Sequence, residues 1–146
     1  MSDAEDTFFL DTNVLVYAVD EADLAKQQIA AALVREAILS GRGIISIQVV
    51  QEFLNVARRK FKQPMTIEQC RGHIRNVLEP LCAYFPSIST MDRALLVIDE
   101  TGYHFYDALI VTAAIESGCR TLYSEDLQHG RKVQGLTILN PFIDVG

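Results

Sequence analysis

The sequence lacks an excess of basic residues. Its 146 residues include 13 Lys and Arg against 19 Asp and Glu, which gives a formal net charge of −6. A protein that coats nucleic acid without selectivity presents a broadly positive surface. That class is therefore excluded, and any binding of nucleic acid has to come from a local basic patch.

The sequence also lacks paired cysteines. Cys70, Cys82 and Cys119 are scattered and form no CxxC motif, which excludes a disulfide framework and a zinc site of the usual spacing. No apolar run approaches the ~20 residues of a membrane helix. The leader MSDAEDT is acidic, unlike a secretory signal. We therefore expect a cytoplasmic protein with reduced thiols.

Internal boundaries are missing as well. No repeat, low-complexity tract or linker rich in Pro, Gly and Ser interrupts the chain, and its length suffices for one domain with a proper core. Hydrophobic residues make up 49% of the chain and charged residues 22%, which is typical of a globular protein. We expect residues 1–146 to form a single domain.

What is present is an alternation of strand and helix patterns. Short apolar segments predict strands at residues 7–11, 43–46, 86–89, 120–124 and 136–139. Periodicity and capping residues predict helices at 13–19, 23–40, 48–60, 66–84, 92–99 and 106–117. The helix from residue 66 starts with a capping box, Thr66 and Gln69, and is kinked or split at Pro80. Helices between strands imply parallel βαβ units, so the expected fold is an α/β protein, a three-layer α/β/α sandwich.

One acid stands inside apolar sequence. In FFLDTNVLVY, Asp11 directly follows the apolar run Phe8–Leu10, and further apolar residues start three positions later, at Val14. An ionised carboxylate is costly to bury unless it is paired or binds a metal. Asp11 is therefore either a local helix cap or one part of a charged site that other segments complete.

Three further acids fall at the same edge of the predicted sheet. Glu52 lies in the helix after the second strand, Asp107 begins the late helix, and Asp126 follows the strand that ends at Ser124. Each alone has a local explanation: a solvated glutamate, a helix cap or a turn. Together, four carboxylates raise one another's pKa values unless a cation neutralises them. Oxygen ligands suit Mg²⁺, which polarises phosphate and activates water for phosphodiester hydrolysis.

Four motifs carry these acids: FFLDTNVLVYA, IISIQVVQEF, YHFYDALIVTAA and TLYSEDLQHG. In this order they resemble the motifs of the PIN-domain family of metal-dependent ribonucleases, and within it those of the VapC-like toxins of type II toxin–antitoxin systems. That family opens with a strand ending in Asp-Thr/Ser-Asn and places a Glu in the helix after strand two. Its last two acids come from a late helix and from a strand and turn. The likeness runs across nearly the whole chain.

The resemblance implies a five-stranded parallel sheet and an endoribonuclease that cleaves single-stranded RNA by metal-activated water. The implied catalytic residues are Asp11, Glu52, Asp107 and Asp126. Of these, Asp11, Asp107 and Asp126 are the implied ligands of Mg²⁺ or Mn²⁺, and Glu52 holds a second metal or orients the water. Glu125, next to Asp126, is the alternative fourth acid. The implied positioning residues are Thr12, Asn13, Ser46 and Ser124.

The resemblance also implies two protein partners, an antitoxin that covers the acidic site and a second copy in a homodimer. Candidates for RNA contact come from the residues themselves. Arg58, Arg59 and Lys60 follow the Glu52 helix, although a helix C-terminus favours cations in any case. Tyr103, Phe105 and Tyr106 are candidates for stacking on bases, for the core or for a dimer contact.

Two other functions remain open. A non-catalytic PIN scaffold would use the same fold for binding alone. A haloacid-dehalogenase-like phosphatase would use Asp11 as its nucleophile, because Asp11-Thr12-Asn13 is close to the Asp-x-Asp motif of that class. Asn13 cannot do the proton transfer of the second carboxylate in that motif, and we find no later lysine and paired-Asp motifs. We therefore expect the nuclease.

Overall fold

The computed structural model describes residues 6–144, so all but the last two residues of the acidic leader lie outside the described residues. Within this range six strands form one sheet: β1 (Phe8–Leu10), β2 (Gly43–Ser46), β3 (Cys82–Tyr84), β4 (Thr121–Tyr123), β5 (Lys132–Val133) and β6 (Leu136–Leu139). They lie in the order β3-β2-β1-β4-β6-β5. All neighbouring strands pair in parallel except β5, which is antiparallel to β6.

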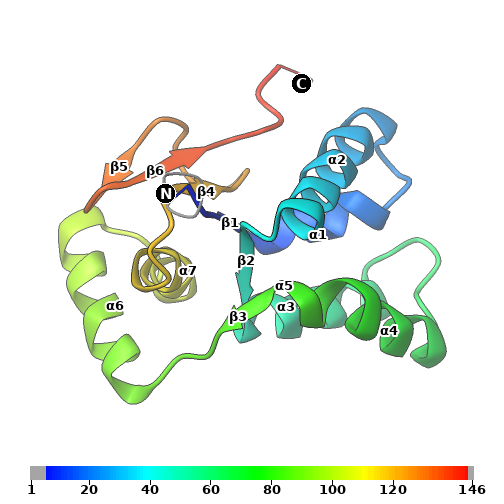
Figure 1. The fold of residues 1–146 in the computed structure, drawn as a ribbon, viewed down its shortest axis with the longest axis horizontal. Coiled ribbons are helices and arrows are strands. Elements are labelled where there is room, and N and C mark those ends of the chain that lie inside the picture. Colours follow the sequence, from blue (N-terminus) through cyan, green and yellow to red (C-terminus); the bar gives the residue numbers. More distant parts are fainter. Residues whose placement is uncertain (1–5, 145–146) are drawn as a thin grey trace.

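Helices connect these strands and cover both faces of the sheet (Figure 1). In chain order they are α1 (Thr12–Val19), α2 (Leu24–Ser40), α3 (Ile47–Arg59), α4 (Ile67–His73), the π-helical η2 (Ile74–Leu78), α5 (Glu79–Leu81), α6 (Ile88–Thr101) and α7 (Phe105–Glu116). Helices α6 and α7 pack together on one side, whereas α1 to α4 lie on the other (Figure 1). The predicted three-layer α/β fold is confirmed. No helix within residues 6–144 is long and apolar enough to span a bilayer.

Strand β1 is the centre of the sheet and of the core. All three of its residues are buried, as expected for a parallel strand that is covered on both faces. Phe9 pairs in register with Ile44 of β2 and with Leu122 of β4. Helix α7 packs against β2 and β4, and every residue from Ala108 to Ala114 is buried. A helix that is apolar on all sides belongs in the interior.

Gly43 lets helix α2 approach the start of β2. A Cβ atom at this position would lie 2.1 Å from the Cβ of Ala37 and 2.7 Å from its Cα. Glycine is therefore the residue that fits here without a shift of α2. Ala37 is itself fully buried, so two small residues set the distance between this helix and the sheet.

Two predicted features of the sheet need correction. The sheet has six strands rather than five, because the two-residue strand β5 adds an antiparallel edge. The strand predicted at 86–89 is wrong: the third strand is β3, and residues from Ile88 onward form α6. Cys82 and Tyr84 pair with Ile45 and Ser46 of β2, so pairing with a distant strand outweighs the local helical pattern there.

The observed helix boundaries show which local sequence signals predicted the start of a helix correctly. The capping box of Thr66 and Gln69 is confirmed. The helix that follows is divided into α4, η2 and α5, and Pro80 lies in the first turn of α5, where proline is tolerated. Helix α6 starts after Ser87, whose N–H donates to Oγ1 of Thr90 (3.0 Å), and not at Asp92 as predicted.

The strand order reverses between β1 and β4. From β1 the chain continues to β2 and β3 on one side, and then crosses to β4 and β6 on the other. The carboxyl ends of β1 and β4 lie side by side, since Leu10 pairs with Tyr123. Binding sites in open parallel sheets form at such a switch point. Asp11 and Ser124, which follow these two strands, therefore stand where a site is expected.

Candidate active site

Asp11 stands where the central strand becomes helix α1. Its Oδ1 accepts a hydrogen bond from the backbone N–H of Thr12 (2.7 Å), and its Oδ2 accepts one from the hydroxyl of Ser124 (2.7 Å). It is the N-cap of α1 and only 6% exposed. Asp11 is thus a helix cap and, through Ser124, is also joined to the segment after β4. The cap and the contact with another segment, which the sequence offered as alternatives, are therefore both present at Asp11.

Thr12 and Asn13 connect this position to two more acids. The Thr12 hydroxyl donates to Oε1 of Glu52 (2.6 Å), and Nδ2 of Asn13 donates to Oδ2 of Asp126 (3.0 Å). Three successive residues of the first motif therefore bring β1, α3 and the loop after β4 to one place.

Asp107 approaches the same place from the first turn of α7. Burial is the main cause that raises the pKa of its carboxyl group, and the negative charge of Asp126 raises it further. His104 acts in the opposite direction, and Glu52 makes a smaller contribution that again raises the pKa. Asp107 is therefore within the electrostatic field of two of the other acids, although it comes from the opposite helical layer.

The pKa of Asp11 is raised from 3.8 to about 7. Burial is the largest cause, and the hydrogen bonds from Ser124 and Thr12 oppose it. The negative charges of Asp126 and Glu52 then raise the pKa further. Two hydrogen bonds do not offset the loss of water around this carboxylate. Asp11 and Asp107 thus each experience the negative charges of Asp126 and Glu52.

A protein-family model matches most of the chain. The family model of the PIN domain matches residues 8–133, a range that contains all four acids. The chain belongs to the PIN domain family. No curated protein matches it significantly in sequence.

Solved structures similar to this PIN chain include proteins of toxin–antitoxin systems. A toxin–antitoxin complex from Klebsiella pneumoniae has a TM-score of 0.66 and 16% identity, over 92% of this chain and 98% of the other. VapC20 of Mycobacterium tuberculosis, described as a sarcin-ricin loop cleaving toxin, has a TM-score of 0.60 and 18% identity, over 82% and 90%. VapBC2 from Rickettsia felis, bound to a promoter DNA fragment, has a TM-score of 0.58 and 20% identity, over 90% of this chain and 96% of the other. At these identities the likeness shows a shared fold.

Ser46 and the basic residues occupy other places in the PIN fold. Ser46 caps α3, where its Oγ accepts a long hydrogen bond (3.5 Å) from a backbone N–H of the same helix. Arg58, Arg59 and Lys60 are exposed at the opposite end of α3. Arg58 donates to the carbonyl of Met65 (2.6 Å). Within residues 6–144, no hydrogen bond or ion pair joins these basic residues to the four acids.

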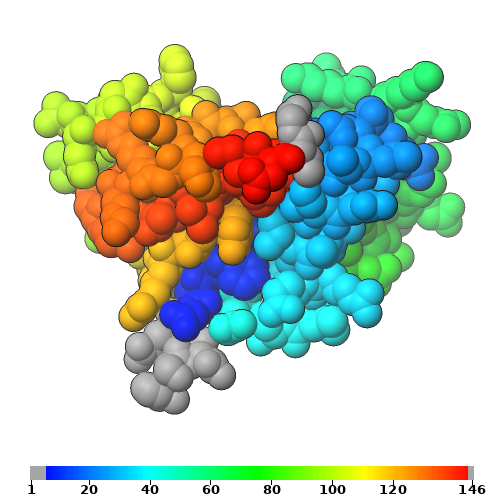
Figure 2. Space-filling model, turned by 90° about the horizontal axis from the view of Figure 1, so that it is seen from above, coloured from blue at the N-terminus to red at the C-terminus, as the bar shows by residue number. Residues whose placement is uncertain are grey.

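Glu125 is engaged by a different set of residues. Its carboxylate accepts a hydrogen bond from the Tyr17 hydroxyl (2.7 Å) and pairs with the Lys26 ammonium (2.5 Å). The ring of Phe142 packs edge-on against Tyr17, with centroids 5.0 Å apart. Figure 2 shows the residues after β6 (red) against helix α2 (blue). The geometry therefore groups Asp126, rather than Glu125, with the other acids. No sequence signal predicts these contacts, since Lys26 and Glu125 are 99 positions apart.

Gln48 is a site residue that the sequence analysis missed. Its Nε2 donates to Oε2 of Glu52 (3.1 Å) and to the carbonyl of Tyr106 (3.0 Å). The spacing of four residues on one helix could have predicted the first contact. The second contact joins α3 to the residue before Asp107 and has no local signal. Gln48 therefore connects two of the segments that supply acids.

The donor set suits a hard divalent cation in its chemistry. Asp11, Asp107 and Asp126 supply carboxylate oxygens, which Mg²⁺ and Mn²⁺ accept as ligands. A cation would also relieve the repulsion that raises the pKa values of Asp11 and Asp107. In the described part of the chain no group of three His, Cys, Asp or Glu side chains is already arranged to hold an ion.

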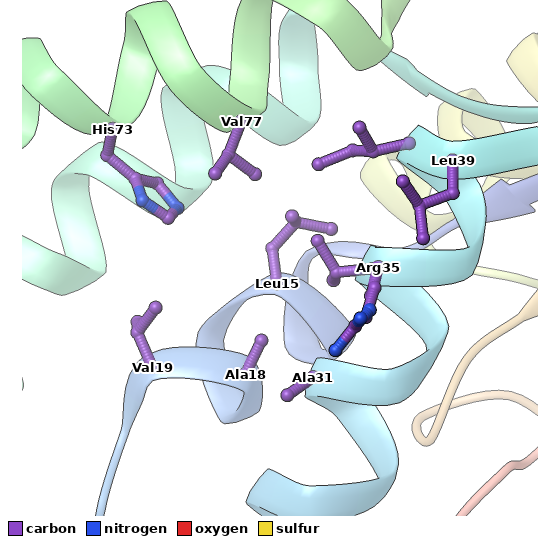
Figure 3. Close-up of a pocket in the computed structure, with 10 residues that line it drawn as sticks. Leu15, Ala18, Val19, Ala31, Arg35, Leu39, His73 and Val77 are labelled. Atoms are coloured by element: carbon purple, nitrogen blue, oxygen red, sulfur yellow. The ribbon is translucent and has the colours of Figure 1, made fainter. Parts of the chain in front are cut away.

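A separate apolar pocket of about 310 Å³ opens between α1, α2 and the helical segment α4–η2. Leu15 projects into it from α1, and His73 and Val77 face it from the opposite helix (Figure 3). Leu15 lies one helical turn beyond Asp11, which caps the same helix. The pocket and the acidic site are therefore joined by α1.

The raised pKa of Asp11 makes a prediction about stability and pH. Its folded-state pKa of about 7 exceeds the ordinary 3.8, so the folded protein binds more protons between these pH values and loses stability as the pH rises from about 4 to about 7. Asp11→Asn keeps a capping side chain without the charge. We expect the variant to gain roughly 2–4 kcal/mol relative to wild type between pH 4 and pH 8.

Urea unfolding with a chelator present at both pH values measures this difference. Asp92→Asn, which removes an exposed carboxylate of α6, corrects for the general loss of one negative charge. Parallel pH dependence in wild type and Asp11→Asn would contradict the electrostatic account of the site.

Proposed function

We propose that this PIN chain is a metal-dependent endoribonuclease that cleaves single-stranded RNA, and that it is the toxin of a toxin–antitoxin pair. One observation carries the proposal: at the switch point of the sheet, hydrogen bonds join the segments that carry Asp11, Glu52 and Asp126, and the charges of Glu52 and Asp126 act on both Asp11 and Asp107. Such repulsion lowers stability unless a bound cation balances it. The similar structures, which include a toxin that cleaves the sarcin-ricin loop, support both the activity and the role.

The four acids divide into two roles in this proposal. Asp11, Asp107 and Asp126 would hold Mg²⁺ or Mn²⁺, which would supply positive charge to the phosphodiester and acidify water. Glu52 would orient the attacking water and accept its proton as the water oxygen bonds to phosphorus, and the ribose oxygen that leaves would take a proton from solvent. The hydrogen bonds from Thr12 and Gln48 fix both oxygens of Glu52 for this purpose.

Neutral and basic side chains support the acids. Ser124 and Asn13 hold Asp11 and Asp126 in position, and Ser46 caps the helix that carries Glu52. The exposed basic end of α3, Arg58, Arg59 and Lys60, contacts the RNA backbone away from the cleaved bond, because an acidic protein needs a local positive surface for RNA.

The metal requirement gives the central prediction. Asp11→Asn replaces a charged ligand by a neutral one, so we expect at least a tenfold loss of Mn²⁺ affinity and roughly a 100-fold or greater loss of single-stranded RNA cleavage. Calorimetry with Mn²⁺ and a gel assay on labelled RNA measure the two effects, with Asp92→Asn as the control for charge.

The other outcomes select between the remaining functions. If neither protein cleaves RNA and the variant binds Mn²⁺ as wild type does, a non-catalytic PIN scaffold becomes the better explanation. Hydrolysis of p-nitrophenyl phosphate with no cleavage of RNA would favour the phosphatase.

We propose that the apolar pocket of Figure 3 receives the antitoxin. Its described lining is almost wholly apolar and includes Leu15, Val34 and Val77, which suits a buried side chain of a protein partner better than RNA. A partner seated there lies against α1, the helix that Asp11 caps. It could therefore cover the acids and suppress cleavage.

Two neighbouring alanines of α2 test this surface. Ala31 lines the pocket and Ala32 does not, and both are exposed. Ala31→Glu places a charge against apolar surface, so we expect it to weaken binding of the protein encoded next to this gene by roughly 10- to 100-fold. Ala32→Glu should bind like wild type, and both variants should keep their RNA cleavage. Equal binding by the two variants in a titration would contradict the assignment.

We propose a homodimer formed through helix α6. Ile88 and Leu95 are two helical turns apart and Leu96 adjoins them, so three exposed apolar side chains share one side of this helix. An exposed apolar patch is typical of a protein interface.

Leu96→Glu tests the dimer, because a charge in a buried interface is costly. Leu24→Glu is the matched control, since Leu24 and Leu96 are both 64% exposed on different helices. We expect light scattering to give a monomer for Leu96→Glu and a dimer for wild type and Leu24→Glu. A monomeric wild type, or a dimer in all three proteins, would contradict the proposal.

We propose the cytoplasm as the place of action, because Cys70, Cys82 and Cys119 all carry free thiols and such thiols persist in a reducing compartment. We also propose that residues 1–146 form one PIN-like domain, since the family match spans most of the chain.

A further inference from the structure

A second cavity, of about 330 Å³, opens beside the acids. It lies between the first turns of α3, the segment from β3 into α6, and the first turns of α7. The residues most relevant to binding are Gln48, Gln51, Met91, Phe105, Tyr106 and Leu109. None of the described residues that line it is charged, so it suits a neutral group rather than a phosphate or a metal ion.

This cavity shares a wall with the acidic site. Gln48 lines the cavity and donates one amide hydrogen to Glu52 and the other to the carbonyl of Tyr106. Tyr106 directly precedes Asp107. A group in the cavity is therefore separated from two of the four acids by one side chain and one peptide unit.

The lining has the chemistry that a nucleobase needs. Tyr106 is 65% exposed, and its ring and that of Phe105 meet edge to face with centroids 5.3 Å apart. Exposed rings offer stacking surface to any base. Gln48 uses both amide hydrogens within the protein, so its Oε1 carbonyl is the part that can accept from a base edge. Gln51 adds an exposed amide with both donor and acceptor atoms.

We propose that this cavity binds the nucleobase of a nucleotide adjacent to the cleaved phosphate, with Tyr106 stacking on the base and Gln48 and Gln51 contacting its edge. The inference rests on the proposed RNA cleavage and adds a specificity subsite to it. The uncharged subsite holds the base, while the neighbouring acidic site acts on the phosphodiester. The position of the cut then depends on the base that occupies the cavity.

A comparison of two proteins on two kinds of RNA tests this subsite. Wild type and Tyr106→Ala are each assayed on one single-stranded RNA and on copies in which a single nucleotide near the cut carries an abasic ribose. We expect the abasic substitution at one adjacent position to lower kcat/KM of wild type by roughly five- to 100-fold. On the intact RNA, Tyr106→Ala should show a kcat/KM as low as that of wild type on the abasic RNA. The abasic substitution should then lower the kcat/KM of Tyr106→Ala by little more.

Matched variants separate stacking from structure. Tyr106→Phe keeps the ring and should restore the wild-type preference. Phe85→Ala removes an aromatic side chain that is 66% exposed but does not line the cavity, and it should leave the preference unchanged. Mn²⁺ affinity should be the same in all four proteins.

If Tyr106→Ala and the abasic substitution lower kcat/KM independently, so that their effects multiply, the proposed subsite is wrong and the proposed nuclease is unaffected. A wild type that is insensitive to abasic sites, together with a Tyr106→Ala protein of altered oligomeric state, would assign the cavity to a second copy of the chain. If wild type cleaves no RNA, the proposed function fails. The same comparison on binding of uncleaved oligonucleotides then decides the subsite separately.

Discussion

The burial of one carboxylate at the end of the central strand is the constraint on which the site depends. Asp11 follows a strand that is buried on both faces, and it accepts two hydrogen bonds, yet its pKa is raised to about 7. Hydrogen bonds redistribute the charge of a carboxylate but do not neutralise it. The negative charges of Asp126 and Glu52 raise this pKa further, and the same two charges act on Asp107, where His104 opposes them. A cation bound among these carboxylates would lower the electrostatic cost of keeping them ionised.

The strand order of the sheet places residues from separate segments next to Asp11. Because the strand order reverses between β1 and β4, the residue after each strand meets the other at one edge of the sheet. Ser124 and Asn13 then cross from one segment to the other with direct hydrogen bonds. Both ends of the Asn13 amide are used, since its Oδ1 also accepts from the N–H of Glu125 (3.3 Å). Asn13 is thus committed to positioning, which further weakens the phosphatase alternative.

The loop after β4 is held from two sides. Glu125 pairs with Lys26 and Tyr17 in the helical layer, whereas the next residue, Asp126, bonds to Asn13 at the sheet edge. Adjacent acids therefore have opposite roles, one anchoring the loop and the other completing the group of four. The cavity that we propose for a nucleobase is joined to this group by Gln48, which donates hydrogen bonds to Glu52 and to the carbonyl of Tyr106.

The sequence by itself determined the class of the fold and predicted that the four acids lie at one edge of the sheet. Strands β2 and β6 have the predicted bounds, and the helix predicted at 106–117 is α7, Phe105–Glu116. The carboxyl ends of parallel strands coincide, so four acids placed after strands or at helix starts could be grouped without coordinates. Tertiary structure alone decided the position of β3, the antiparallel edge strand β5, and the choice of Asp126 over Glu125. These features depend on pairing between residues far apart in the chain, such as Lys26 with Glu125, and local periodicity carries no information about such distant partners.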